Sequence, residues 1–343
     1  MADSREFLQL DFDIVSEVLE RFLKRMAPES RREMADVFAE RVRQRCAFDG
    51  SGVLDAPRGL ALGQDLDERG IAVLGPMIDR RQAAEARDFL LDQPCFNGHV
   101  IAASDQVGRS ARDGARAFHY GSYRHEQVLR APHLLELANH PTVLSAAARY
   151  LGCTPTMYSV NAWWSFAGHA EIAPAAQHFH RDYDDFRFCV LFVYLTDVAD
   201  DGSPHLFIQE THDQRRLARR FADDPVVQSP SGAHLRQFLE ELWAKNWHAH
   251  DPLAEQLLVQ LLGDNIVRLD GPAGFTFLED THGFHKGVPP KSTDRLAFWA
   301  RYGVSRGESV KINPMQPVAI ETSGRLPDDP LHRFVNRRLI EFP

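Results

Sequence analysis

The stretch TMYSVNAWWSF at residues 156–166 decides the fold class of this chain. It is rich in aromatic and β-branched residues, and so are residues 186–195, 265–269, 274–278 and 295–302, with turn-forming residues between these runs. Regular helices do not alternate with the runs, so parallel strand pairing is disfavoured. The sequence therefore predicts a mainly β protein with helices, in which antiparallel strands form a barrel or a sandwich rather than a doubly wound parallel sheet.

Helical patterns dominate the first 150 residues. Apolar residues recur at helical spacing between Phe12 and Ala47, residues 79–91 form an amphipathic helix with Asp79 as N-cap, and residues 132–151 form another that ends at Gly152. Residues 213–262 turn helical again inside the β region, and we expect this insert to lie over one end of the barrel. The predicted parts are a helical N-terminal extension (1–65), a β domain with the insert (66–310) and a C-terminal tail packed on the domain (311–343).

The composition of the chain disfavours several classes of function. The chain has 343 residues, 44% of them apolar and 25% charged, as in an ordinary soluble globular protein, and its longest apolar runs are too short to span a bilayer. The N-terminal MADSREFLQLDFD does not resemble a secretory signal, so a cytoplasmic location is expected. A net charge of −9 disfavours nucleic acid as a partner. The partner expected is a small molecule, and nothing in the sequence indicates an oligomeric state.

Several common chemistries lack their motifs. The four cysteines are scattered without a Cys-x-x-Cys pair, so buried reduced thiols are expected instead of disulfides or structural zinc. There is no glycine-rich phosphate loop and no Gly-x-Ser-x-Gly turn. Kinase, nucleotide-dehydrogenase and serine-hydrolase functions are therefore disfavoured.

The segment QHFHRD at residues 177–182 carries the strongest chemical signal. His180 and Asp182 are two residues apart, so on a strand both side chains project from one face while Arg181 points away. A non-haem Fe(II) site needs one more histidine and leaves the remaining positions open for co-substrate and oxygen. The stretch LEDTHGFHKG at residues 278–287 offers His282 and His285 for that role.

Arg295 stands ten residues beyond His285, at the start of an aromatic strand. Its planar guanidinium can bind both oxygens of a carboxylate, while the other end of the same acid chelates iron. This is how 2-oxoglutarate would be held.

This order of residues resembles the phytanoyl-CoA dioxygenase family of Fe(II)- and 2-oxoglutarate-dependent oxygenases. The resemblance covers about residues 66–305 and extends to GIAVL (70–74), YLG (150–152), DGSPH (201–205) and ETH (210–212). It implies a double-stranded β-helix with iron bound by His180, Asp182 and His285. It further implies that Arg295 binds the distal carboxylate of 2-oxoglutarate and that Asn161 also touches this co-substrate.

The resemblance also implies a reaction. With O2 and 2-oxoglutarate, such an enzyme hydroxylates a small natural-product or lipid-like molecule and releases succinate and CO2. A carboxylate at position 182 removes the halide site of halogenating relatives, which makes hydroxylation the default and leaves desaturation and ring closure open. Arg181, the Glu210-Thr211 pair and the long insert depart from the family pattern and leave the substrate undefined.

Two other functions remain as alternatives: a metal-binding β-barrel that senses or binds without turnover, and a metal-dependent enzyme that uses no oxo acid. Arg295 argues against both. For His178 and His282 we expect roles beside the metal or in a loop, and His212 either lies near the site or caps a turn. Trp163, Trp164, Phe166 and Trp299 are expected to fill the core.

Overall fold

Two antiparallel β-sheets form the centre of the computed structural model, which describes residues 23–46, 48, 52–98, 108–112, 117–169, 177–244, 252–304 and 317–342. The large sheet has the strand order β1-β9-β6-β11-β5-β4-β2-β3, and the small sheet has the order β10-β7-β8. The strands are β1 (Ile71–Pro76), β2 (Pro94–Asn97), β3 (Arg109–Ser110), β4 (Tyr120–Ser122), β5 (Thr156–Ser165), β6 (Phe188–Tyr194), β7 (His205–Ile208), β8 (Ile266–Leu269), β9 (Phe275–Glu279), β10 (His285–Gly287) and β11 (Arg295–Gly303).

The path of the chain between the sheets has the order of a jelly roll. After β5 in the large sheet, an isolated bridge joins His180 to His285 at the edge of the small sheet. The chain then visits the large sheet (β6), the small sheet (β7 and β8), the large sheet (β9), the small sheet (β10) and the large sheet again (β11). This alternation is that of a double-stranded β-helix. The expected fold class, mainly antiparallel β with helices, is confirmed.

Strand β11 shows why the large sheet has two apolar faces. Its side chains alternate, so Leu296, Phe298 and Tyr302 join the core beneath the helices, whereas Ala297 and Trp299 join a second core between the two sheets. Residues from both sheets build this second core, which packs the sheets face to face. The odd-numbered side of β11 therefore faces the interior in which the candidate site lies.

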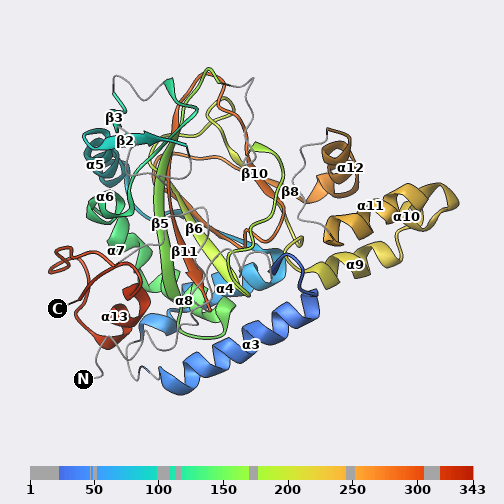
Figure 1. The fold of residues 1–343 in the computed structure, drawn as a ribbon, viewed down its shortest axis with the longest axis horizontal. Coiled ribbons are helices and arrows are strands. Elements are labelled where there is room, and N and C mark those ends of the chain that lie inside the picture. The colour runs from blue at the N-terminus through green and yellow to red at the C-terminus, as the bar shows by residue number, and fades with distance from the viewer. Residues whose placement is uncertain are drawn as a thin grey trace.

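Helices cover the outer face of the large sheet, beside β5 and β11 in Figure 1. The two ends of the predicted helix at 79–91 are close to those observed, and Asp79 forms a capping box with Gln82. The predicted helix 132–151 is wrong in one respect, because it is broken before Pro141, where His140 is extended, as residues before proline prefer. The helices on this side are α3 (Pro28–Arg45), α4 (Pro57–Arg69), α5 (Arg80–Leu91), α6 (His125–Arg130), α7 (Leu134–Ala138), α8 (Pro141–Leu151) and α13 (Pro330–Asn336).

The two terminal parts differ partly from expectation. The predicted helix from Phe12 lies mostly outside the described residues, and the expected connection at 49–63 contains the start of α4 at Pro57. In the C-terminal part, Asn336 of α13 exchanges side-chain hydrogen bonds of 2.7 and 3.1 Å with Asn139, which ties α13 to the helical layer. The division at residues 65 and 310 stays a prediction.

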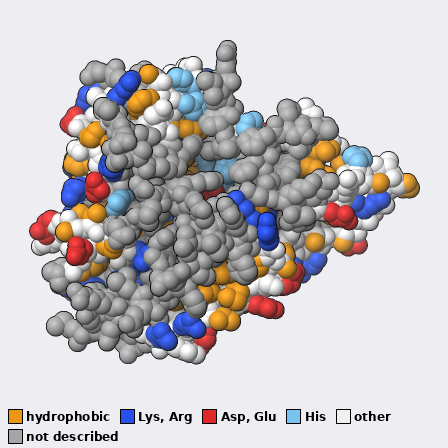
Figure 2. Space-filling view, viewed as in Figure 1, with side chains coloured by type: hydrophobic (Ala, Val, Ile, Leu, Met, Phe, Trp, Pro, Cys, Tyr) orange, Lys and Arg blue, Asp and Glu red, His pale blue; other side chains and the backbone are white. Residues whose placement is uncertain are grey.

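The insert projects beyond the small sheet as a lobe of four helices, α9 (Gln214–Ala222), α10 (Pro225–Gln228), α11 (Ala233–Ala244) and α12 (Pro252–Leu262). It has its own apolar core, which includes Leu217, Leu239 and Leu258 and is completed by Phe179 and Phe284 from outside the insert. Its outer surface carries basic, acidic and apolar side chains side by side (Figure 2). The insert is thus anchored on residues that flank His180 and His285.

Two further expectations concern the described residues only. All four cysteines are buried and free, which confirms the expected reduced thiols. Across the described parts of the chain, no helix combines the length and the apolar character needed to cross a membrane.

Candidate metal centre

His180, Asp182 and His285 converge at the edge of the small sheet. One ligand atom from each residue lies within 4.8 Å of the other two, and Nε2 of His285 is 3.8 Å from Oδ2 of Asp182. We expected His180 and Asp182 to share the face of a strand, but residues 181–187 form no strand, and His180 pairs with His285 through an isolated bridge. The side chains nevertheless converge. Two imidazoles and one carboxylate at this separation are a donor set that fits a divalent first-row metal.

Hydrogen bonds fix both imidazoles in the orientation that metal binding needs. Nδ1 of His180 donates to the carbonyl oxygen of His178 at 2.8 Å, and Nδ1 of His285 donates to that of Gly283 at 3.0 Å. With the proton on Nδ1, each Nε2 carries a lone pair that can bind a metal. The two rings lie 4.2 Å apart between centroids, so these lone pairs serve one centre.

The carboxylate ligand candidate is held through its backbone. The N–H of Asp182 donates to the carbonyl oxygen of Thr281 at 2.8 Å, and its own carbonyl oxygen accepts a hydrogen bond from Nδ1 of His282 at 3.1 Å. Arg181 points away, donating to the carbonyl of Thr211 at 2.8 Å and lying over the ring of Phe284. His282 therefore supports Asp182 and does not belong to the cluster of three.

Arg295 lies at the start of β11 on the interior face and is buried. Its Nη1 donates to the carbonyl oxygen of Ser203 at 2.5 Å and its Nη2 to Oγ of Ser165 at 3.3 Å, whereas its Nε has no partner among the described residues. An unsatisfied guanidinium N–H in a buried place is costly unless an anion accepts it. The residues present therefore fit a carboxylate ligand at Arg295.

Asn161 lies on the same interior face, opposite Trp299 in the pairing of β5 with β11. Its Oδ1 accepts hydrogen bonds from Nη1 of Arg301 and Oγ of Ser159, both at 2.9 Å. Arg301 also forms an ion pair of 2.9 Å with Asp184, two residues after Asp182. The structure thus places Asn161 in a network that braces the segment after the carboxylate, and contact with a co-substrate stays a prediction for it.

His205 and Glu279 are interior residues that sequence reasoning missed. Nε2 of His205 lies 2.9 Å from Oε2 of Glu279, both side chains are buried, and the His205 ring stacks on His285 at 5.6 Å between centroids. Burial, followed by the positive charge of Arg295, lowers the pKa of His205 to about 3, and burial raises the pKa of Glu279 to about 8. One sequence signal could have revealed this pair: Glu279 stands at an inward-facing position of β9, a strand that is otherwise largely apolar.

Aromatic side chains of β5, β6 and β11 pack in the interior between the two sheets. Trp163 meets Trp299 edge to face at 4.3 Å between ring centroids, and Phe192 lies 5.2 Å from the ring of His205. Trp299 is buried, as expected of a core residue, but Trp163 and Phe192 are only partly buried. The interior thus offers an apolar wall next to its polar groups.

The other two histidines considered from the sequence lie outside the cluster. His178 is half-buried, with Nδ1 3.5 Å from Oε2 of Glu255 in the insert. Nε2 of His212 lies 3.2 Å from the carbonyl oxygen of Asp67, and its ring packs on Gly70 so closely that a Cβ there would be 2.5 Å from Nδ1. Both residues join the site region to neighbouring helices.

Comparisons with known proteins give similarity at the level of solved structures only. No family model matches the chain, and no curated protein matches it. A solved structure of the non-heme alpha ketoglutarate dependent epimerase SnoN from nogalamycin biosynthesis aligns with 72% of this chain and 84% of its own, at 14% identity and a TM-score of 0.46. EctD from S. alaskensis with 2-oxoglutarate and 5-hydroxyectoine aligns with 75% and 79%, at 15% identity and a TM-score of 0.46. HygX from Streptomyces hygroscopicus with nickel and 2-oxoglutarate aligns with 71% and 86%, at 13% identity and a TM-score of 0.40.

Proposed function

We propose that this protein is a non-haem Fe(II)- and 2-oxoglutarate-dependent oxygenase, similar to the phytanoyl-CoA dioxygenase family, that hydroxylates a small organic molecule. The observation that carries the proposal is the cluster of His180, Asp182 and His285, whose two histidines turn Nε2 toward one point. The cluster uses three protein ligands, which leaves positions for a chelating co-substrate and oxygen.

Arg295 supports 2-oxoglutarate as the co-substrate. Its buried Nε has no partner in the part of the chain that the structure describes, and its charge reaches His205, whose ring stacks on His285. One carboxylate of a short dicarboxylic acid would meet this guanidinium while the other end reaches the metal. Bound iron with 2-oxoglutarate and O2 supplies the oxidation, in which one oxygen atom enters a substrate C–H bond and the other enters succinate, with loss of CO2.

The remaining residues orient and shield this reaction. His282 and Thr281 hold the backbone of Asp182, which keeps this residue beside the two histidines. Trp163, Trp299 and Phe192 exclude water from the interior and offer apolar contacts. An organic substrate with an apolar body suits these walls, which supports a natural-product or lipid-like molecule.

The test is turnover of 2-oxoglutarate by the whole protein. Protein reconstituted anaerobically with Fe(II) is exposed to O2 and 2-oxoglutarate, with and without a panel of organic substrates, and succinate is measured. We expect Fe(II)-dependent succinate that rises with a suitable substrate and disappears in His180→Ala. Binding of Fe(II) without affinity for 2-oxoglutarate would contradict the proposal and support a metal-binding protein without turnover.

A further inference from the structure

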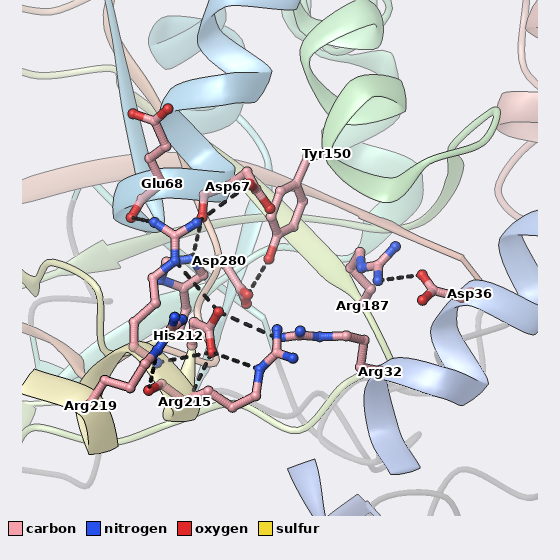
Figure 3. A network of polar contacts seen from close by, with 12 residues as sticks. Arg32, Asp36, Asp67, Glu68, Tyr150, Arg187, His212, Arg215, Arg219 and Asp280 are labelled. Atoms are coloured by element: carbon pink, nitrogen blue, oxygen red, sulfur yellow. Dashed lines mark hydrogen bonds and ion pairs between the residues drawn. The ribbon is translucent and has the colours of Figure 1, made fainter. Parts of the chain in front are cut away.

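A second cavity lies outside the metal centre, between α3, the start of α9 and the loop that precedes β10. Its volume is about 470 Å³, and its lining does not include His180, Asp182 or His285. Figure 3 shows Arg32 reaching into it from α3 and Arg215 from α9, with Asp280 and Tyr150 at its far wall. Helix, insert and loop therefore meet around one polar space.

The lining of this cavity carries an excess of positive charge. It contains six arginines and three aspartates, and Asp36 outside the lining pairs with Arg187 at 2.7 Å, which leaves an excess of two positive charges in a chain whose net charge is −9. Such a concentration is unfavourable without an anion, because like charges repel across a space only partly open to solvent. The arginines are Arg31, Arg32, Arg149, Arg187, Arg215 and Arg216.

Asp213 lies among three of these arginines, but its single negative charge does not neutralise them. Its Oδ2 lies 3.4 Å from Nη2 of Arg32 and 3.5 Å from Nε of Arg216, and its Oδ1 lies 3.8 Å from Nε of Arg215. These contacts are longer than the 2.7–2.9 Å of well-formed guanidinium–carboxylate bonds. One carboxylate is thus shared loosely by three arginines. Arg216 also donates from Nη1 to the carbonyl oxygen of Glu68 at 2.8 Å, and its Nη2 lies 3.6 Å from Oδ2 of Asp67.

The N-terminus of α9 adds to the positive potential at the same place. Asp213 caps α9, so the positive end of this helix dipole faces the cavity. On the α3 side, Arg31 donates from Nη2 to the carbonyl oxygen of Asp185 at 3.0 Å, but its buried Nε has no partner among the described residues. Because this nitrogen is closed off from solvent, it lies behind the cavity wall and cannot itself reach an anion there.

We propose that this cavity binds a phosphate group, as free diphosphate or as part of an organic phosphate. Several guanidinium groups around one point match the oxygens of a tetrahedral dianion better than a single flat carboxylate. The space exceeds what one phosphate fills, so a diphosphate or an ester fits. The proposal does not depend on the oxygenase function, because it concerns binding alone.

The experiment measures binding calorimetrically on metal-free whole protein, which avoids chelation of iron by the probe. Inorganic phosphate, pyrophosphate and a simple organic diphosphate ester are titrated at constant ionic strength. Pyrophosphate is expected to bind at one site, and Arg216→Gln is expected to weaken binding by about tenfold to a hundredfold through loss of charged hydrogen bonds. Tighter binding of the ester than of pyrophosphate identifies an organic phosphate, and the reverse identifies the free anion.

The Asp213→Asn variant is expected to gain binding, and a gain cannot be explained by misfolding. Asparagine caps helices as well as aspartate does, so α9 is preserved while the competing negative charge is removed. This variant is expected to bind pyrophosphate several-fold more tightly. Arg219→Gln is the matched control, because Arg219 is exposed on the same helix and does not line the cavity. Absence of pyrophosphate binding, equal weakening in Arg219→Gln, or no gain in Asp213→Asn would each overturn the proposal.

Discussion

His180 and His285 face each other across a single β-bridge, and each turns its Nδ1 to the carbonyl oxygen of the residue two positions earlier. The two histidines thus share one local arrangement, although they are 105 positions apart in the chain. The bridge itself consists of two backbone hydrogen bonds, of 3.0 and 3.1 Å. Because the carbonyl oxygen of His178 orients one ring and that of Gly283 orients the other, both Nε2 atoms are free of these hydrogen bonds and are placed where they could bind one metal.

The first prediction concerns the third ligand. Replacing His285 by Asn should abolish tight Fe(II) or Co(II) binding, whereas replacing His282 by Asn should weaken it only about tenfold to a hundredfold, as for groups that orient a ligand. Metal binding is measured by titration with Co(II) and its visible absorption. Asp200→Asn serves as a control, because that carboxylate is 95% exposed on the surface. Equal loss in the two histidine variants would contradict the assignment of His285.

The second prediction concerns Arg295. Arg295→Gln should keep the metal site but lower the affinity for 2-oxoglutarate by about tenfold to a hundredfold, the usual effect of losing hydrogen bonds to a charged group. Calorimetry with Ni(II)-loaded protein measures this without turnover. Arg268→Gln, a change at a partly exposed ion pair on β8, should leave the affinity unchanged. An unchanged affinity in Arg295→Gln would exclude this residue as the co-substrate anchor.

The third prediction links the insert to the metal centre. Leu258 of α12 is fully buried in the core that Phe179 and Phe284 complete, so Leu258→Ala should lower the free energy of unfolding by about 2–5 kcal/mol. It should also weaken Co(II) binding, because both phenylalanines adjoin ligand histidines. Leu144→Ala, in the core beneath the large sheet, should destabilise similarly without changing metal affinity. Equal metal affinity in the two variants would show that the insert does not support the site.

The fourth prediction concerns pH. Partial desolvation and then the charge of Arg58 lower the pKa of His140, whose side chain stays partly exposed and whose Nδ1 accepts the N–H of Thr142 as the N-cap of α8. A lowered folded pKa means that the unfolded chain takes up the proton first, so this contribution to stability is lost as pH falls below the ordinary value of about 6.5. His140→Asn keeps a cap that does not titrate. Its melting temperature should therefore fall less than that of the wild type between pH 7.5 and 5.5, and parallel curves would contradict this role.

The strands of the fold were largely predictable from sequence. Runs of aromatic and β-branched residues marked β5, β6, β9 and β11 to within one or two residues, because these residues suit a pleated sheet that is buried on both faces. The break at Pro141 was missed although the residue before a proline resists helical geometry. The apolar residues on both sides of Pro141 continue one helical periodicity, and this periodicity was given more weight than the proline.

The candidate site was less predictable than the fold. The spacing of His180 and Asp182 suggested a shared strand face, but the two side chains meet through a single bridge and a hydrogen bond from Asp182 to Thr281. The pairing of His205 with Glu279 joins residues 74 positions apart and has no local pattern. Such contacts depend on how the two sheets pack, which spacing along the chain does not encode.

The insert shares an apolar core with Phe179 and Phe284. A library of insert variants should therefore separate the positions that face this core from those that face outward. Outward positions such as Val226, which is 61% exposed, can be randomised to alter the lobe with little expected effect on the candidate metal centre. Inward positions such as Leu258 belong to the core that includes Phe179 and Phe284, so a change there is expected to disturb the candidate metal centre as well as the lobe. Selections on the two classes should therefore be kept apart, and iron content should be recorded for every clone with an inward substitution.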